Sequence, residues 1–285
     1  MREELKEAIS LLQKDDAASV QRALQLMQDT VYSFSMKVCG HREDAEDTMQ
    51  DVLVSSLPHL AKINSPQALS VWLYTAAKNR CWRSRKKLSY RKSVALEDLM
   101  PDESELSALL ASAGATPEQS ALERQDQQLV HQAVLKLPPQ YRIVLVLHDM
   151  EELETDLVAK VLSLKPGTVR VRLHRARLLV RKEMEKLLTR AAQEASARSK
   201  AKRKRPRECT ELFGNLSEYL DGRLQPKTCD QMEAHIAACP ECIAFIGDLK
   251  RAIDRCRKLD IPLNSEVCAA LRRQLAEEYL RLIAS

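Results

Sequence analysis

The chain has 285 residues, a formal net charge of +5, only six glycines and only three phenylalanines. At roughly 100–200 residues per domain, this length allows two or three compact units. Few glycines beside many Ala, Leu, Glu, Lys and Arg residues predict an all-α protein. No apolar run approaches the ~20 residues of a membrane span, and the charged N-terminal sequence is unlike a signal peptide. We therefore expect a cytoplasmic protein with no membrane contact.

The motif content argues against catalysis. The glycines stand far apart, so the chain has no dinucleotide-binding or phosphate-binding glycine loop. Neither G-x-S-x-G nor H-E-x-x-H occurs. We expect a protein that is not an enzyme. Because thiols stay reduced in the cytosol, the eight cysteines are not interpreted as a disulfide framework, and those that are clustered are interpreted first as metal ligands.

Charge divides the chain into blocks. Residues 78–92 hold eight bases and no acid, whereas residues 93–126 hold eight acids and one base. Residues 160–190 then hold ten bases and two acids, and residues 198–207 hold seven bases and no acid. Two basic surfaces separated by an acidic spacer predict two contacts with a polyanion.

These blocks, together with the proline and glycine positions, define the expected domain organisation. Three helical domains are predicted, joined by an acidic linker and by a basic, flexible linker without an apolar stripe. The domains are 1–92, 127–190 and 208–285, and the linkers are 93–126 and 191–207.

Four helices are predicted in the first domain, and the first of them, at about 2–14, has no assignable role. Apolar residues recur at helical spacing from Leu24 to Val38, so this segment buries one face. A helix with acids in its first turns follows, although such acids usually form only a solvated face. In the fourth segment, from Pro66 onward, aromatic side chains alternate with cations. This pattern is typical of a surface that binds phosphates and stacks bases, while the alternative places Trp72 in the core.

The segments DAEDTMQDV and WLYTAAKNR, followed by basic residues, resemble region 2 of bacterial RNA polymerase sigma factors of the sigma-70 family, in the extracytoplasmic-function group. The resemblance implies that the acidic helix binds the clamp helices of the polymerase β′ subunit. It implies that the second helix engages the minus-ten promoter element as it melts. The matching polymerase-binding positions are Asp44, Glu46, Asp47, Gln50 and Asp51. The matching DNA-binding positions are Trp72, Tyr74, Lys78, Asn79, Arg80, Arg83 and Arg85.

The second domain is predicted to contain a helix-turn-helix. A tight turn at residues 163–165 follows an apolar helix, and Pro166 suits the first position of the next helix. Four arginines are expected on the exposed face of that helix: Arg170, Arg172, Arg175 and Arg177. An alternative is an ordinary bundle helix with a solvated basic face.

This segment resembles sigma region 4 through Leu137-Pro138, Val158-Ala159, Gly167-Thr168-Val169 and Arg175-Ala176-Arg177. The resemblance implies that the second helix reads the minus-thirty-five element in the major groove and that the polymerase β flap is a further partner. By this analogy the residues facing DNA are Lys165, Thr168, Arg170, Arg172 and Arg175. Ser163 stands where the family usually has a turn glycine.

The C-terminal third contains the spacing His235-x3-Cys239-x2-Cys242. One helical turn separates His235 from Cys239, and the spacing Cys239-x2-Cys242 closes a chelate turn. We therefore expect these residues to bind one zinc ion. The fourth ligand is either Cys209, which we favour, or Cys229. The alternative is that these cysteines are small buried residues.

The same third, with YLDG and HIAACPEC, resembles the zinc-binding anti-sigma domain, which is normally a separate protein. The resemblance implies regulation in cis through intramolecular contact with the sigma domains. Residues 271–283 are predicted to form a final amphipathic helix, which packs either on the sigma surface or on its own domain.

Three hypotheses follow. The first is a sigma factor that needs core RNA polymerase. The second is a conventional helix-turn-helix regulator that acts without polymerase, and the third is a zinc-dependent enzyme acting on nucleic acid. The acidic helix at 44–51 and the aromatic and basic helix at 71–85 favour the first hypothesis, since a repressor needs neither.

Overall fold

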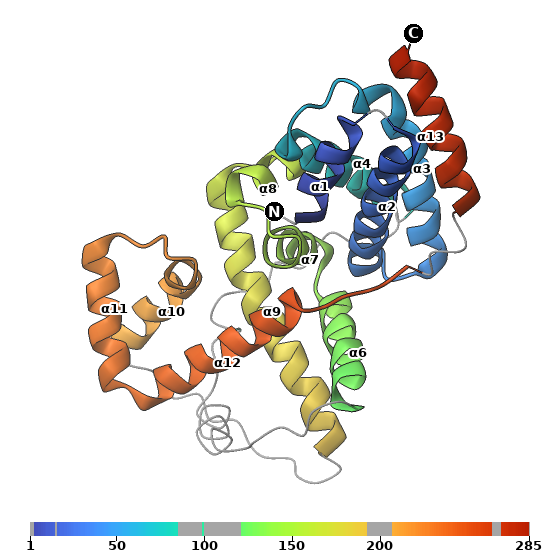
Figure 1. The fold of residues 1–285 in the computed structure, drawn as a ribbon. Coiled ribbons are helices and arrows are strands. Elements are labelled where there is room, and N and C mark those ends of the chain that lie inside the picture. Colours follow the sequence, from blue (N-terminus) through green and yellow to red (C-terminus); the bar gives the residue numbers. More distant parts are fainter. Residues whose placement is uncertain are drawn as a thin grey trace. The chain divides into compact units, whose positions relative to one another are not determined.

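The computed structural model describes residues 3–14, 16–84, 99, 121–192, 207–263 and 269–284 (Figure 1). These residues contain helices and no strand, which confirms the expected all-α fold. None of the helices in these ranges is both long enough and apolar enough to cross a bilayer. Residue contacts divide the chain into two compact units, and each unit combines segments that are far apart in sequence.

The first unit contains residues 1–90, 146–169 and 260–285. Its helices are α1 (Glu3–Leu12), α2 (Ala17–Cys39), α3 (Arg42–Leu60), α4 (Pro66–Ser84), the π-helical turn η2 (Val146–Met150), α8 (Thr155–Leu162) and α13 (Ala269–Ala284).

Helix α2 is the centre of this unit. The Asp16 side chain caps its start by accepting a hydrogen bond from the Ser19 amide at 2.9 Å, and Gly40 ends it in the left-handed conformation. Helices α1, α3 and α4 pack around it, and the rings of Phe34 and Tyr74 lie 5.0 Å apart between α2 and α4. The apolar face of α1, which the sequence analysis did not predict, is buried in this bundle.

Segments from later in the chain complete the same unit. Helix α8 packs against α4, and α13 packs against α2 and α3 (Figure 1). The turn η2 packs against α2. The guanidinium of Arg272 on α13 donates to Oε1 of the buried Gln28 at 2.7 Å, and Leu275 and Tyr279 are buried. A disulfide between Cys39 and Cys81 joins the end of α2 to α4. The interpretation of the cysteines as metal ligands did not predict this bond.

The second unit contains residues 91–145 and 170–259. Its helices are α6 (Ala121–Lys136), α7 (Pro139–Leu145), α10 (Arg207–Leu220), α11 (Pro226–Ala238) and α12 (Pro240–Arg257). Helix α9 (Pro166–Ala192) begins in the first unit and continues into the second. Leu178 of α9 belongs to the same apolar cluster as Phe213 and Leu216 of α10 and Phe245 and Leu249 of α12. One face of the middle of α9, around Leu178, is therefore covered by α10 and α12.

The turn between α8 and α9 has the predicted form. Helix α8 ends at Leu162, and α9 begins at Pro166, as expected. Ser163 ends α8 in the left-handed conformation, with φ of 55°, and its amide donates to the carbonyl oxygens of Ala159 and Lys160. A side chain beyond glycine is strained in this conformation.

We predict that Ser163→Gly raises the free energy of unfolding by about 0.5–1 kcal/mol, because glycine adopts the left-handed conformation without a clash of its Cβ atom. Urea unfolding measures this change. Ser163→Ala is the matched control, since alanine keeps the Cβ atom and the strain. Equal stability of the two variants would contradict the prediction.

Candidate zinc centre and nucleic-acid interface

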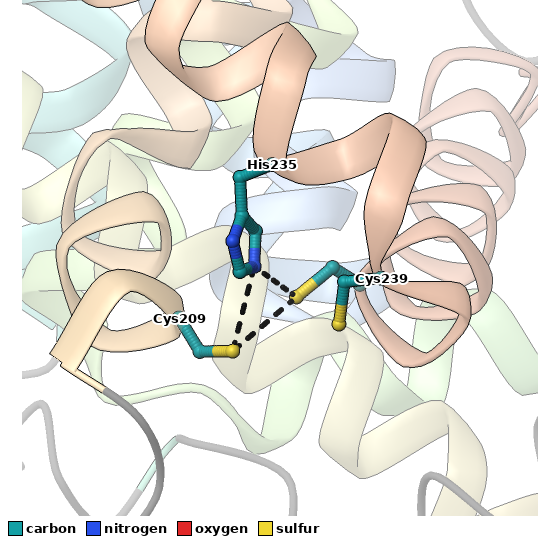
Figure 2. Close-up of side chains that lie close together, drawn as sticks. Cys209, His235 and Cys239 are labelled. Carbon is teal, nitrogen blue, oxygen red and sulfur yellow. Dashed lines mark hydrogen bonds between the residues drawn. The ribbon is translucent and has the colours of Figure 1, made fainter.

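Four potential metal ligands meet where α10, α11 and α12 come together. The ligand atoms of Cys209, His235, Cys239 and Cys242 all lie within 4.8 Å of one another. Nε2 of His235 is 3.4 Å from Sγ of Cys209 and 3.4 Å from Sγ of Cys242, and these two sulfurs are 4.0 Å apart. Figure 2 shows the imidazole of His235 directed at the thiol of Cys209.

The local sequence explains this convergence. Pro240 cannot continue α11, so that helix stops at Ala238 and α12 starts with Pro240 at its first position. Cys239 lies between the two helices with φ of −122° and ends one of them while starting the other. The break therefore places Cys239 and Cys242 in one chelating turn beside His235.

The donor set fits zinc. Three thiols and one imidazole are ligands that zinc prefers, and four of them make a closed, structural site. With Zn–S bonds of about 2.3 Å, two sulfurs of a tetrahedron lie about 3.8 Å apart, and sulfur and nitrogen lie about 3.5 Å apart. The separations of 4.0 and 3.4 Å in the structure are close to both values.

Electrostatics also favours a cation at this point. Burial raises the pKa of the Cys242 thiol above its usual range, and the neighbouring thiols of Cys239 and Cys209 add to the effect. Such a group does not hold several thiolates without a compensating positive charge. A divalent metal ion supplies that charge, so the four residues suit a resident zinc ion.

Cys229, the other candidate for fourth ligand, is outside this group. Its thiol donates to Oε1 of Glu233, one turn further along α11, at 3.7 Å. Of the remaining cysteines of this third, Cys256 is buried in α12, and Cys268 lies outside the described residues.

The predicted polymerase-binding residues lie on α3. Asp47, Gln50 and Asp51 are exposed, and Val54, which follows at the same helical spacing, is 51% exposed. They form one stripe, which we call the α3 stripe. Asp44 and Glu46 are half-buried, and Glu46 accepts a hydrogen bond from Nε of Arg42 at 2.7 Å.

The predicted DNA-binding residues on α4 divide into two groups. Asn79 and Arg80 are exposed, with Arg80 paired to Asp51, whereas Tyr74 and Lys78 are buried. The hydroxyl of Tyr74 donates to Oε2 of Glu151 at 2.8 Å, and Nζ of Lys78 donates to the carbonyl oxygen of Val161 at 2.9 Å. Burial lowers the pKa of Lys78 below its usual value.

The remaining predicted residues of this helix are less informative. Trp72 is half-buried with its ring 5.2 Å from that of His59, so it is neither fully in the core nor free in solvent. Arg83 belongs to α4, and Arg85 lies outside the described residues.

Lys165, directly before α9, is exposed. On α9 itself, Thr168 and Arg170 are exposed, and Arg172 and Arg175 are half-buried. The structure therefore leaves the first turns of the predicted recognition helix accessible. A guanidinium nitrogen of Arg175 lies 3.5 Å from the hydroxyl oxygen of Tyr141.

The expected exposure of Arg177 is wrong. This side chain is 1% exposed and donates to Oδ1 of Asp221 at 2.7 Å and to the carbonyl oxygen of Ser217 at 3.3 Å. Arg181, one turn further, pairs with Asp248 at 3.1 Å and lies over the ring of Phe245. The turn that follows α10 supplies Asp221, and α12 supplies Asp248, so these two cations face protein and not solvent.

His174 lies on the same covered face. Its Nδ1 is 3.0 Å from the Ser217 hydroxyl, and its ring packs edge-on against Phe213. Burial, together with the charges of Arg177 and Arg175, lowers the pKa of His174 to about 4. The imidazole is therefore neutral at pH 7.

Sequence reasoning missed a buried ion pair. Lys37 of α2 and Glu151, which follows η2, have fully buried side chains, and Nζ lies 2.9 Å from Oε1. The available signal was a lysine one turn after Phe34, among the apolar positions of a buried helix. Nothing in the local sequence identified its partner.

Comparisons with known families agree with this arrangement. The family described as "Sigma-70 region 2" matches residues 24–91, and the family described as "Sigma-70, region 4" matches residues 127–180. Residues 24–91 and 127–180 therefore belong to the families of sigma-70 regions 2 and 4. A zinc-finger family matches residues 209–242, which begin and end at two cysteines of the cluster. This sigma factor therefore carries a zinc-finger-like segment after its two sigma regions.

Several curated relatives are sigma factors. The ECF RNA polymerase sigma factor SigW of Bacillus subtilis is 25% identical over 183 residues, which are 64% of this chain and 98% of that protein. RNA polymerase sigma factor YlaC of Bacillus subtilis is 29% identical over 158 residues, or 55% of this chain and 86% of that protein. The sigma factor SigE of Mycolicibacterium smegmatis is 28% identical over 167 residues, with 59% and 62% covered. Family membership also confirms that the chain is not an enzyme.

We predict that the full chain binds zinc through the four clustered residues and that Cys209→Ala weakens this binding about 100-fold. Structural zinc sites contribute about 10–16 kcal/mol, so one of four ligands accounts for about 3 kcal/mol. Competition titration with a chromophoric chelator measures the affinity.

Cys229→Ala is the matched control for this experiment and should bind zinc as the unsubstituted chain does, because its thiol lies outside the cluster. A loss of affinity in Cys229→Ala with none in Cys209→Ala would exclude the proposed ligand set.

We also predict that acid weakens the packing of α10 on α9. The pKa of His174 is about 4 when folded and about 6.5 when unfolded, so the unfolded chain binds an extra proton between these values. The stabilisation is complete above pH 6.5 and is lost as pH falls, by about 2 kcal/mol at pH 5. Urea unfolding at pH 7 and pH 5 measures this loss.

Other groups also titrate in this range, so the loss is read as a difference between variants. His174→Gln should lose about 2 kcal/mol less than the unsubstituted chain. His41→Gln, which removes an exposed imidazole, should behave as the unsubstituted chain does. Identical pH dependence in all three proteins would disprove the prediction.

Proposed function

We propose that this sigma factor binds core RNA polymerase, directs promoter-specific transcription initiation and is regulated in cis by its own zinc-binding segment. The observation that carries the regulatory part is the burial of α9 beneath α10 and α12. Arg177 and Arg181 of α9 are each at most 2% exposed, and they pair with Asp221, directly after α10, and with Asp248 of α12. The zinc-binding helices thus occupy one face of the helix that is expected to read DNA.

The finer assignments follow the family resemblance. We propose that the α3 stripe contacts the β′ clamp, that region 4 contacts the β flap, and that α4 and α9 bind the minus-ten and minus-thirty-five elements. The domain boundaries proposed for these roles are 1–92, 127–190 and 208–285, and one zinc ion serves the last domain. Exposure of Asp47 and Arg170 supports accessible partner surfaces on α3 and α9.

The second candidate function is a conventional helix-turn-helix regulator that acts without polymerase. Such a regulator needs no region 2. Here the region 2 family matches residues 24–91, and the acidic stripe on α3 has no task in a repressor. The zinc-dependent enzyme is disfavoured because four clustered ligands leave no open coordination position for a reactive water molecule.

Helix α13 provides a second contact between the C-terminal third and the sigma regions. It packs on α2 and α3, and its Arg272 is bonded to Gln28 at 2.7 Å. We propose that this helix and the zinc-binding helices act together, one on region 2 and the other on region 4. Removal of residues 208–285 eliminates both contacts.

We predict that deletion of residues 208–285 raises promoter-specific transcription about tenfold. The deletion uncovers α9 and releases α2 and α3, and a contact worth 1.4 kcal/mol already changes an equilibrium tenfold. The measurement uses purified core polymerase and fragmented genomic DNA, with sequencing of RNA 5′ ends, so no promoter has to be known beforehand.

A chain ending at residue 263 is the matched intermediate, because it lacks α13 but keeps α10, α11 and α12. An intermediate level of transcription would assign part of the regulation to α13. Unchanged or lost transcription in the 208–285 deletion, in spite of normal binding to core polymerase, would refute inhibition in cis. No binding of either chain to core polymerase would refute the sigma function itself.

A further inference from the structure

The first unit contains an ionic cluster that joins region 2 to region 4. Nζ of Lys37 on α2 lies 2.9 Å from Oε1 of Glu151, and the hydroxyl of Tyr74 on α4 donates to Oε2 of the same carboxylate at 2.8 Å. Each carboxylate oxygen thus has a donor from a different region 2 helix. The Lys37 and Glu151 side chains are fully buried.

A second contact lies on the same two regions. Nζ of Lys78 donates to the carbonyl oxygen of Val161 at 2.9 Å, and α8 packs along α4. Val161 belongs to the last turn of α8, where carbonyl oxygens lack intrahelical partners and where a cation is favourable. Lys78 therefore completes the end of α8 in place of a residue of region 4 itself.

We propose that these contacts form a latch that closes region 2 on the α8 segment of region 4, and that the latched chain docks on core polymerase without binding melted promoter DNA. The DNA-binding roles of Tyr74 and Lys78 in this inference rest on the proposed function. Both side chains are buried by the latch, whereas Asp47, Gln50 and Asp51 of the α3 stripe stay exposed. The latch thus leaves the polymerase-binding surface of region 2 accessible while it covers residues that are proposed to bind melted promoter DNA.

The chemistry of the latch suits a contact that must open. A buried ion pair adds little net stability, because desolvation offsets its attraction, but it tolerates no mispairing. It therefore specifies one closed arrangement. When the latch opens, Lys37, Glu151 and Lys78 are hydrated, while an apolar contact of the same extent would leave a patch that favours aggregation.

Hydrogen exchange of the full chain, without polymerase or DNA, tests the latch directly. Glu151→Gln keeps the shape of the side chain but leaves the Lys37 charge buried without a counter-charge. We expect the amides of α8 to exchange about tenfold faster in this variant. Glu154→Gln is the matched control, because Glu154 is exposed and makes no side-chain capping bond. Equal exchange in α8 for both variants would overturn the latch.

A double variant separates opening of the latch from general misfolding. Lys37→Met combined with Glu151→Gln leaves no unpaired buried charge, so protection of α8 should largely return. Protection that stays lost in the double variant, together with faster exchange throughout α1 and α2, would overturn the latch in favour of simple destabilisation.

Binding measurements complete the test. The unsubstituted chain and Glu151→Gln should bind core polymerase with affinities within about twofold, while Glu151→Gln should form more open promoter complex on DNA that the 208–285 deletion transcribes. If the unsubstituted chain binds core polymerase more weakly than Glu151→Gln does, the proposal that the latched chain still docks on polymerase is overturned. If no chain supports transcription while Glu151→Gln still accelerates exchange in α8, the sigma function fails and the latch stands.

Discussion

Buried cations hold together segments that are distant in sequence, and the remaining contacts depend on this constraint. In the first unit Lys37 requires Glu151, which lies 114 residues away. In the second unit Arg177 pairs with Asp221 and Arg181 pairs with Asp248, at separations of 44 and 67 residues, and Arg181 also pairs with Glu185 of its own helix. An unpaired charge in these positions would be very costly, so each pair permits essentially one arrangement of its helices. Apolar side chains then pack around the arrangement that the charges specify.

The zinc-binding helices illustrate a second constraint. Helix α11 buries only Met232 among its residues, so packing alone stabilises it weakly. Four potential ligands come from α10, α11, α12 and the break between the last two, and a bound metal ion would compensate for this small core. Because α10 and α12 also cover α9, the geometry of the metal site is coupled to the surface that covers the predicted recognition helix.

Much of the fold and of the metal site follows from local sequence. The spacing from His235 to Cys242 determines a chelating turn, because Pro240 breaks the helix inside it. The turn before Pro166 and the apolar stripe of α2 are likewise visible as short-range patterns, since helical periodicity depends only on neighbouring residues. The sequence favoured Cys209 over Cys229 because a helix that ends at Asp221-Gly222 could return Cys209 to the cluster, and the structure brings Cys209 there.

By itself the sequence determined the helices, the sigma-like regions and three of the four clustered residues, because periodicity, turn residues and ligand spacing are short-range properties. Only the tertiary structure decided which polar faces are covered. Arg177, Tyr74 and Lys78 look like solvent-facing residues in the sequence, yet all three are buried. The physical reason is that a helical stripe defines a face but not its neighbour, and the partners Asp221, Glu151 and Val161 are supplied by segments remote along the chain.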